Sequence, residues 1–140
     1  MSQQTIAITV HADVNAPLSK VWECWNAPEH IVHWNFANDD WHSPKAENDF
    51  HVGGKFTYTM AAKDGSFSFD FWGIYTEIYD QNSLAYSLGD DRKVKVTFED
   101  KGGRTQVTET FEAESQNPVE MQQAGWQAIL NNFKKYVESL

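Results

Sequence analysis

The last stretch of the chain, residues 117–140, restricts the fold more than any other, because it has the pattern of one long amphipathic helix. Asn117 is suited to cap this helix, Pro118 to take its first position, and Glu120 to complete a capping-box-like start. The apolar residues recur at helical spacing and form one stripe: Trp126, Ile129, Leu130, Phe133, Tyr136, Val137 and Leu140. At about 1.5 Å per residue the stripe is roughly 30 Å long, so it needs an equally large apolar surface to cover.

The residues before this helix predict an antiparallel sheet that supplies the surface. Residues 5–14 alternate apolar and polar side chains, as a half-buried strand does, and two short helices are expected at 16–25 and 28–34. A polar loop is expected at 35–48. Tight turns then separate further strands: 53–60, 66–79, 84–88, 94–98 and 105–113. The predicted fold class is therefore α+β, a curved antiparallel sheet of about six to seven strands wrapped around a long C-terminal helix, with two short helices after the first strand.

Length, charge and cysteine content exclude several classes of function. A chain of 140 residues predicts a single domain, 1–140. Its net charge of −9 repels nucleic acid and anionic lipid, so neither is an expected partner. No basic, apolar leader or membrane segment is visible, and Cys24 has no second cysteine to pair with. We therefore expect a cytoplasmic protein.

The order of these elements resembles the helix-grip fold of the START-like (SRPBCC) superfamily. Four motifs resemble more specifically small stand-alone members of the heat-shock-protein-90 ATPase activator homologue family: APLSKVW at 16–22, VGGKF at 52–56, FWGIYTEI at 71–78 and GWQAIL at 125–130. The resemblance implies a cavity between sheet and long helix that holds lipids, polyketides or other apolar molecules. It also implies a chaperone as a second kind of partner, and a few relatives are cyclases or other enzymes.

An excess of aromatic residues supports a binding cavity. Phe67, Phe69, Phe71 and Tyr75 share one face of the strand at 66–79, while Trp72 lies on the other face, where a bulge near Gly73 could re-aim it. Such a stripe serves either as a pocket wall or as a closed core. The residues expected to bind a ligand are Trp34, Trp41, Tyr58, Met60, Phe69, Phe71, Trp72, Tyr86, Trp126 and Leu130.

Three polar residues are candidates for acid–base chemistry. Glu109 falls in line with Val107 and Phe111, which would bury its carboxylate. The poor contrast of the Thr-Glu-Thr run nevertheless favours the opposite facing, with Thr108 and Thr110 inward, or a salt bridge of Glu109 at the rim of the sheet. Asp70 could form a carboxylate pair with Glu109. His42 follows Asp40 and Trp41 in the polar loop, which we expect at the mouth of the cavity.

The remaining motifs indicate no metal or cofactor. His30 and His33 lie three residues apart, and His42 and His51 follow, but this spacing matches no established metal signature. No nucleotide-binding glycine motif is present, so we expect neither metal nor cofactor. Cys24 lies on the apolar face of the first short helix, which predicts a buried, inert thiol.

The sequence thus favours binding of a small hydrophobic or amphipathic ligand in an internal cavity. Two alternatives stay open. One is a module that recognises a protein partner, such as a chaperone, and the other is a cyclase- or hydrolase-like enzyme that uses Asp70, Glu109 or His42. A homodimer is also compatible with a small sheet protein.

Overall fold

The computed structural model describes residues 6–140 of the chain. The first predicted strand begins at Thr5, which lies outside the described residues. The elements follow in the order β1 (Ala7–Val14), α1 (Leu18–Asn26), α2 (Pro28–Ile31), β2 (Trp41–Asn48), β3 (Lys55–Ala62), β4 (Ser68–Tyr79), β5 (Ser83–Leu88), β6 (Lys93–Asp100), β7 (Thr105–Glu112) and α3 (Val119–Glu138). This order confirms the predicted α+β fold class with a helix-grip arrangement.

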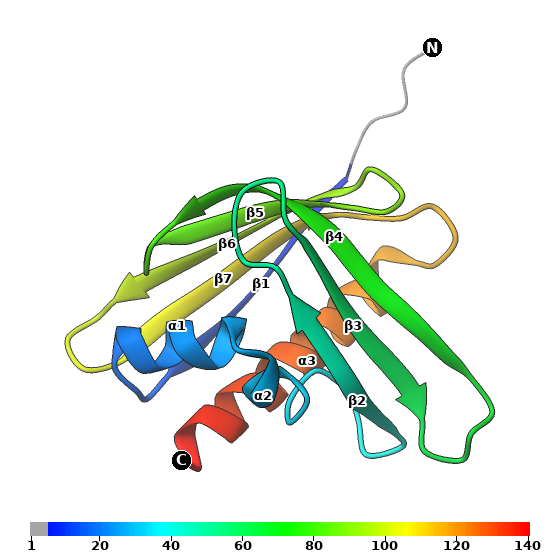
Figure 1. Cartoon of the computed structure of the whole chain (residues 1–140), viewed down its shortest axis with the longest axis horizontal. Helices are drawn as coiled ribbons and strands as arrows, with labels where there is room; N and C mark the ends of the chain where they lie inside the picture. Colours follow the sequence, from blue (N-terminus) through cyan, green and yellow to red (C-terminus); the bar gives the residue numbers. More distant parts are fainter. Residues whose placement is uncertain (1–5) are drawn as a thin grey trace.

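The seven strands form one antiparallel sheet in the order β1-β7-β6-β5-β4-β3-β2. Each hairpin pairs consecutive strands, and β1 closes the series by pairing with β7. Buried residues alternate with exposed ones in β1 and most of β6, and with half-buried ones in β7, which leaves one apolar face. The sheet curls so that α3 lies across this concave face, as Figure 1 shows.

The prediction of a loop at 35–48 was wrong for its second half, because β2 forms an edge strand at Trp41–Asn48. Its residues alternate poorly, and Pro44 lies within it, so neither the periodicity nor the composition indicates a strand. Pro44 is tolerated because an edge strand has one row of backbone groups without a strand partner, and the pairing with β3 is irregular between His42 and Lys45.

The two short helices cover only one end of the concave face. Figure 1 shows α1 and α2 beside the C-terminal half of α3. There the Trp25 and Trp34 rings stack with centroids 5.0 Å apart, and the Phe133 ring of α3 meets both edge-on at 4.9 and 4.8 Å. The helix α2 itself is shorter than predicted and ends at Ile31. The indole nitrogen of Trp34 then donates to the carbonyl of Cys24 (3.0 Å), which ties the turn after α2 to α1.

The long helix begins at Val119, one residue after the predicted first position, Pro118, and the side-chain cap predicted for Asn117 is not formed. Pro118 occupies the capping position and has no side chain that could accept a hydrogen bond. Gln122 orders the approach to the helix instead. Its amide nitrogen donates to the carbonyls of Glu114 (3.0 Å) and Asn117 (2.8 Å), and its oxygen accepts from the backbone N–H of Glu114 (2.9 Å).

Candidate functional site

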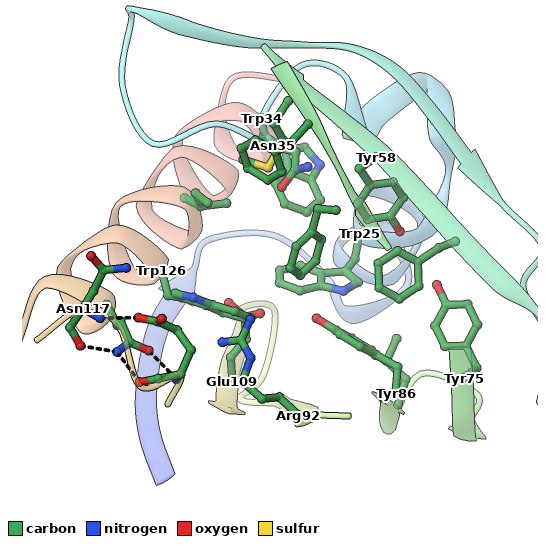
Figure 2. A pocket seen from close by; sticks show the side chains of 18 residues that line it. Trp25, Trp34, Asn35, Tyr58, Tyr75, Tyr86, Arg92, Glu109, Asn117 and Trp126 are labelled. Carbon is green, nitrogen blue, oxygen red and sulfur yellow. Dashed lines mark hydrogen bonds between the residues drawn. The ribbon is translucent and has the colours of Figure 1, made fainter. Parts of the chain in front are cut away.

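A cavity of about 310 Å³ lies between the concave face of the sheet and the N-terminal half of α3. Its wall is mostly aromatic, and Figure 2 shows the labelled side chains arranged around it. The aromatic residues come from α1, the turn after α2, three strands of the sheet (β3, β4 and β5) and α3: Trp25, Trp34, Phe56, Tyr58, Phe69, Phe71, Tyr75, Tyr86 and Trp126.

Trp126 forms the part of the wall that α3 contributes. Its ring stacks on that of Phe111 of β7, with centroids 3.8 Å apart and planes inclined by 11°. The ring of Phe71 of β4 meets it edge-on at 6.0 Å. Trp126 therefore packs against side chains of both β7 and β4, although its own side chain is only half-buried.

Close packing on the strands shapes the opposite wall. Phe56 of β3 lies across Gly73 of β4, where a Cβ atom would come within 2.8 Å of the Phe56 ring. The ring of Phe56 in turn lies 4.8 Å from those of Tyr58 and Tyr86. Glycine at position 73 therefore lets this aromatic cluster approach the sheet.

Glu109 of β7 points into the cavity, which decides between the two facings that the sequence left open. It pairs across the sheet with Val10 of β1 and Val96 of β6, and both valines are buried. Thr108 and Thr110 lie on the outer face, where the hydroxyls of Thr110 and Thr9 are hydrogen-bonded at 3.1 Å. The inward side of this part of β7 is thus apolar except for one carboxyl group.

The carboxyl group of Glu109 is buried without a partner. Glu109 is 5% exposed, and its side chain forms no hydrogen bond or ion pair with any residue in 6–140. Burial raises the pKa of Glu109 from 4.5 to about 8. At neutral pH the group is therefore predominantly the neutral acid, which can both donate and accept a hydrogen bond.

Three tyrosine hydroxyls add polar groups to the wall. The Tyr75 hydroxyl donates to the side-chain oxygen of Asn48 (2.8 Å), and burial raises the pKa of Tyr75 to about 12. Burial also raises the pKa of Tyr58 and of Tyr86 well above the usual value, and the nearby Glu109 raises that of Tyr86 further. All three are neutral phenols at physiological pH.

Asn35 is a cavity residue that the sequence gave no reason to select. It lies in the turn after α2, is 7% exposed, and its side-chain Nδ2 finds no hydrogen-bond acceptor among the residues described. The side chain of Asn132 of α3 donates to the carbonyls of Trp34 (2.9 Å) and Phe36, on either side of Asn35. The backbone at Asn35 is therefore anchored while its amide group stays unpaired.

The segment that we expected at the mouth of the cavity does not line it. Asp40, Trp41 and His42 do not line the cavity, although the Trp41 ring lies 6.2 Å from that of Phe69, which does. Four further polar residues line the cavity, from the turn before β6 to the first turns of α3, and Asn117 among them is exposed: Arg92, Glu114, Asn117 and Gln122. Sequence reasoning missed them because each belongs to a turn or helix start that is polar in most proteins.

Seven of the ten residues expected to bind a ligand line the cavity, and Trp41, Trp72 and Leu130 do not. Trp72 lies on the outer face of β4, with the Lys55 ammonium 4.5 Å from its ring centroid. Leu130 is fully buried in the core. The prediction that the Trp72 side chain faces a ligand was wrong, because the alternation of the strand continues through Gly73 without a bulge there.

The predicted carboxylate pair does not form. Asp70 lies between Phe69 and Phe71, which line the cavity, so its own side chain points to the outer face. It is exposed and accepts a hydrogen bond from the Thr59 hydroxyl (2.8 Å). Among residues 6–140, Glu109 is therefore the single buried carboxyl group in the cavity lining, and the other lining acid, Glu114, is half-exposed.

His30, His33 and Cys24 pack against other side chains of the protein. His30 is hydrogen-bonded to the Tyr136 hydroxyl (2.7 Å), and His33 stacks on the same ring with centroids 5.5 Å apart. Within residues 6–140 no group of three or more His, Cys, Asp or Glu side chains could hold a metal ion. Cys24 is buried as predicted, and burial raises the pKa of its thiol.

Comparison with known proteins shows the family to which the chain belongs. Residues 15–138 match the family described as activator of Hsp90 ATPase homolog 1-like protein (AHSA1). The chain belongs to the AHSA1-like family. A search of curated proteins gave no match. The family and the fold agree with the START-like superfamily, whose helix-grip fold commonly binds ligands or protein partners.

Two solved structures are similar in both sequence and fold. The solution structure of the AHSA1-like protein from Aeromonas hydrophila is 44% identical, with a TM-score of 0.90 over 96% of this chain and 93% of that one. A protein from Cytophaga hutchinsonii is 51% identical, with a TM-score of 0.81 over 94% and 92% of the two chains. A protein from Chromobacterium violaceum, 21% identical, shares the fold with a TM-score of 0.84 over 94% and 96%.

Proposed function

We propose that this AHSA1-like protein binds a small hydrophobic or amphipathic molecule in the cavity between the sheet and α3. The observation that carries the proposal is the cavity itself, about 310 Å³ of space with nine aromatic side chains in its wall. Sites for small molecules typically have volumes of roughly 300 to 1,000 Å³ and mostly apolar walls with a few polar groups. The cavity has both properties.

Two features distinguish this cavity from a loosely packed core. Its lining includes exposed residues, among them Asn117 and Phe69, so solvent and ligands have a way in. It also contains the unpaired carboxyl group of Glu109, which a closed core would leave at a cost of about 1–3 kcal/mol. A bound molecule that forms a hydrogen bond with this group removes that cost.

Calorimetric titration with diphenylmethane, an apolar probe, tests the proposal. The native protein should bind one equivalent, and Ile129→Trp, which fills the cavity from α3, should weaken binding about tenfold or more. Asn131→Trp is the matched control, because Asn131 is an exposed residue of the same helix and should leave binding unchanged. No binding to the native protein, or equal binding to both variants, would refute a ligand site in this cavity.

Recognition of a protein partner is a second candidate. Trp41, Phe67 and Phe69 form an aromatic cluster at the β3–β4 hairpin and its neighbour β2, with ring centroids 5.9 to 6.2 Å apart. Phe67 is 58% exposed, and aromatic clusters of this kind are common in interfaces. Substitution of both Trp41 and Phe67 by serine should abolish capture of an Hsp90-type chaperone if this cluster is the interface, and should leave diphenylmethane binding intact because neither residue lines the cavity.

The structure lends least support to the enzyme hypothesis, because the described residues place a single buried carboxyl group in the cavity and neither Asp70 nor His42 lines it. The cytoplasmic location remains part of the proposal and is supported by the unpaired thiol of Cys24. Within the described residues, no helix is long and apolar enough to cross a membrane. The homodimer remains a prediction that sedimentation of the purified protein tests directly.

A further inference from the structure

Strand β4 has an open edge at its beginning. The strand starts at Ser68, but its pairing with β5 starts only at Gly73, which lies opposite Leu88. The residues before Gly73 therefore pair with β3 alone, and Figure 1 shows this end of β4 continuing past the β5–β6 turn. An open edge of this kind can pair with another extended chain.

The backbone groups on this edge point away from β3. The carbonyl of Phe67 accepts a hydrogen bond from the N–H of Ala62 (2.8 Å), at the end of β3. Further along, the N–H of Tyr75 donates to the carbonyl of Gly54 (3.0 Å), and the register with β3 is regular between these two places. Because backbone groups alternate in direction along a strand, the N–H and C=O groups of Asp70 face the open side.

A groove of about 350 Å³ lies along the open edge. One of its sides is β4 from Phe69 to Trp72, and the other is the β5–β6 turn with its flanking residues Leu88 and Arg92. The ring of Trp72 reaches this turn, since a Cβ atom at position 89 would come within 2.5 Å of it. Gly89 therefore lets Trp72 form the outer wall of the groove.

The side chains of this edge face two different environments. Phe69 and Phe71 line the internal cavity, whereas Asp70 and Trp72 lie on the outer face of the sheet. Residues directly opposite each other on neighbouring antiparallel strands have their side chains on the same face. A strand added here would therefore place alternate side chains over apolar rings, and the side chains between them on the outer face beside Asp70.

The groove carries one uncompensated negative charge. Its charged residues are Asp70, Asp90 and Arg92. Arg92 Nε lies 2.7 Å from Asp90 Oδ2, so these two charges compensate each other. Within residues 6–140 Asp70 forms no ion pair, and its exposed carboxylate accepts a hydrogen bond from the Thr59 hydroxyl (2.8 Å). Because opposite charges on neighbouring strands attract, a cationic side chain fits opposite Asp70.

We propose that the open edge of β4 binds an extended segment of a partner protein in which apolar and basic residues alternate. The segment runs antiparallel to β4, as β5 does, and its backbone bonds with that of Asp70. Its apolar side chains pack on the rings of Phe69 and Phe71, and a lysine or arginine lies opposite Asp70. This surface goes beyond the proposed ligand site, and it lies along the edge of β4 that faces away from β3.

Calorimetric titration with heptapeptides that have acetylated and amidated ends tests the charge preference. The basic peptide is Ser-Val-Lys-Val-Lys-Val-Ser, and the acidic peptide has glutamate in place of both lysines. The native protein should bind the basic peptide about 3- to 10-fold more tightly, because a lysine attracts Asp70 where a glutamate repels it.

Two methylated forms of the basic peptide test the backbone pairing. The peptide residues opposite Asp70 exchange both hydrogen bonds with β4, so the lysine N–H groups face β4 and the valine N–H groups face away. Methylation of both lysine backbone nitrogens should weaken binding about fivefold or more. Methylation of two valine backbone nitrogens is the matched control and should leave binding unchanged.

Two substitutions on the outer face of β4 assign the charge effect to this edge. Asp70→Lys should reverse the preference, so that the acidic peptide binds more tightly than the basic one. Glu77→Lys changes the net charge by the same amount on the same strand, but β5 pairs with β4 there. This control should keep the preference for the basic peptide. Both residues are exposed, and thermal unfolding verifies that both variants are folded.

Amide hydrogen exchange locates the bound peptide. In the free protein the Asp70 N–H should exchange faster than the Phe71 N–H, which faces β3, and the basic peptide should slow exchange at Asp70. Equal binding of all peptides, no binding, or unchanged exchange at Asp70 would overturn the proposal.

A second copy of the chain is the alternative occupant of this edge. A native protein that sediments as a dimer, with the Asp70 amide already protected, would place a second copy there and overturn the proposal of a basic partner segment. Diphenylmethane binding is measured separately, so failure of the peptides leaves the proposed ligand-binding function standing, and failure of diphenylmethane leaves this proposal standing.

Discussion

The two halves of α3 carry one continuous apolar stripe, yet they have opposite surroundings. In the C-terminal half, Phe133 and Val137 are fully buried against α1, β1 and the Trp25–Trp34 pair. In the N-terminal half, Trp126 and Ile129 are half-buried and border the cavity. The difference arises because α1 and α2 fill the concave face at one end only (Figure 1).

This contrast divides the molecule into a part that stabilises the fold and a part that is available to a ligand. A well-packed core loses stability when any large side chain is removed, whereas the wall of a cavity already lacks some of its contacts. The predictions below test this division, and they run from the largest expected effect to the smallest.

Phe133→Ala should reduce the free energy of unfolding by about 3–5 kcal/mol, because the substitution leaves a void inside a fully buried aromatic cluster. Ile129→Ala, one turn earlier on the same helix, should cost less than about 2 kcal/mol, since this side chain is half-buried beside empty space. Urea unfolding measures both. Equal losses would mean that the two halves of α3 are packed alike.

Stability should depend on pH through Glu109. Its pKa is about 8 in the folded protein against 4.5 in an unperturbed glutamate, so between these values the folded state binds more protons. The free energy of unfolding should therefore fall as pH rises from about 4.5 to about 8, by roughly 4–5 kcal/mol in total, and then level off.

Urea unfolding of the native protein and of Glu109→Gln over this pH range measures the effect. The glutamine variant should lose this component of the pH dependence, while Glu120→Gln, at an exposed position of α3, should keep it. A pH profile that is identical in all three proteins would show that Glu109 is ionised, and therefore solvated or paired, in the native state.

Gln122→Ala should reduce the free energy of unfolding by about 1–3 kcal/mol, because three hydrogen bonds that join Gln122 to Glu114 and Asn117 are lost at a buried position. Gln123→Ala is the control, since Gln123 is exposed. Thermal unfolding compares the two. The opening of the cavity should also be less ordered in Gln122→Ala, seen as faster amide hydrogen exchange at Glu114.

Trp72→Ala should have the smallest effect, about 1 kcal/mol or less on the free energy of unfolding, because Trp72 lies on the outer face and its cation–π contact with Lys55 is exposed. Diphenylmethane binding should be unchanged in this variant and clearly weaker in Trp126→Ala. Reversal of this order in a calorimetric titration would place the ligand on the outside of the sheet.

Some features could be read from the chain because they depend on local periodicity. The alternation in β1, β6 and β7 and the helical stripe of α3 each place apolar residues on one face, and burial follows those faces. The turn residues between successive strands then indicated that neighbouring strands are antiparallel. The family motifs extended this reading to the helix-grip arrangement, which the structure and the family match confirm.

Other features were beyond the sequence because they depend on neighbours distant in the chain. The edge strand β2 carries little alternation of its own and forms because β3 offers it a partner. Asn117 was well placed to cap α3, yet Gln122 orders this segment through bonds that exist only after the chain has turned. Local preferences gave no information about either.

The sequence alone determined that an aromatic sheet and a long amphipathic helix would face each other, because patterning at periods of two and 3.6 residues decides which side chains are buried. Only the tertiary structure decided where they fail to meet. The cavity exists because α1 and α2 cover one end of the concave face, and Glu109 and Asn35 converge on it from segments 74 positions apart in the chain. Volume and polar convergence are properties of side chains in space, which no local pattern encodes.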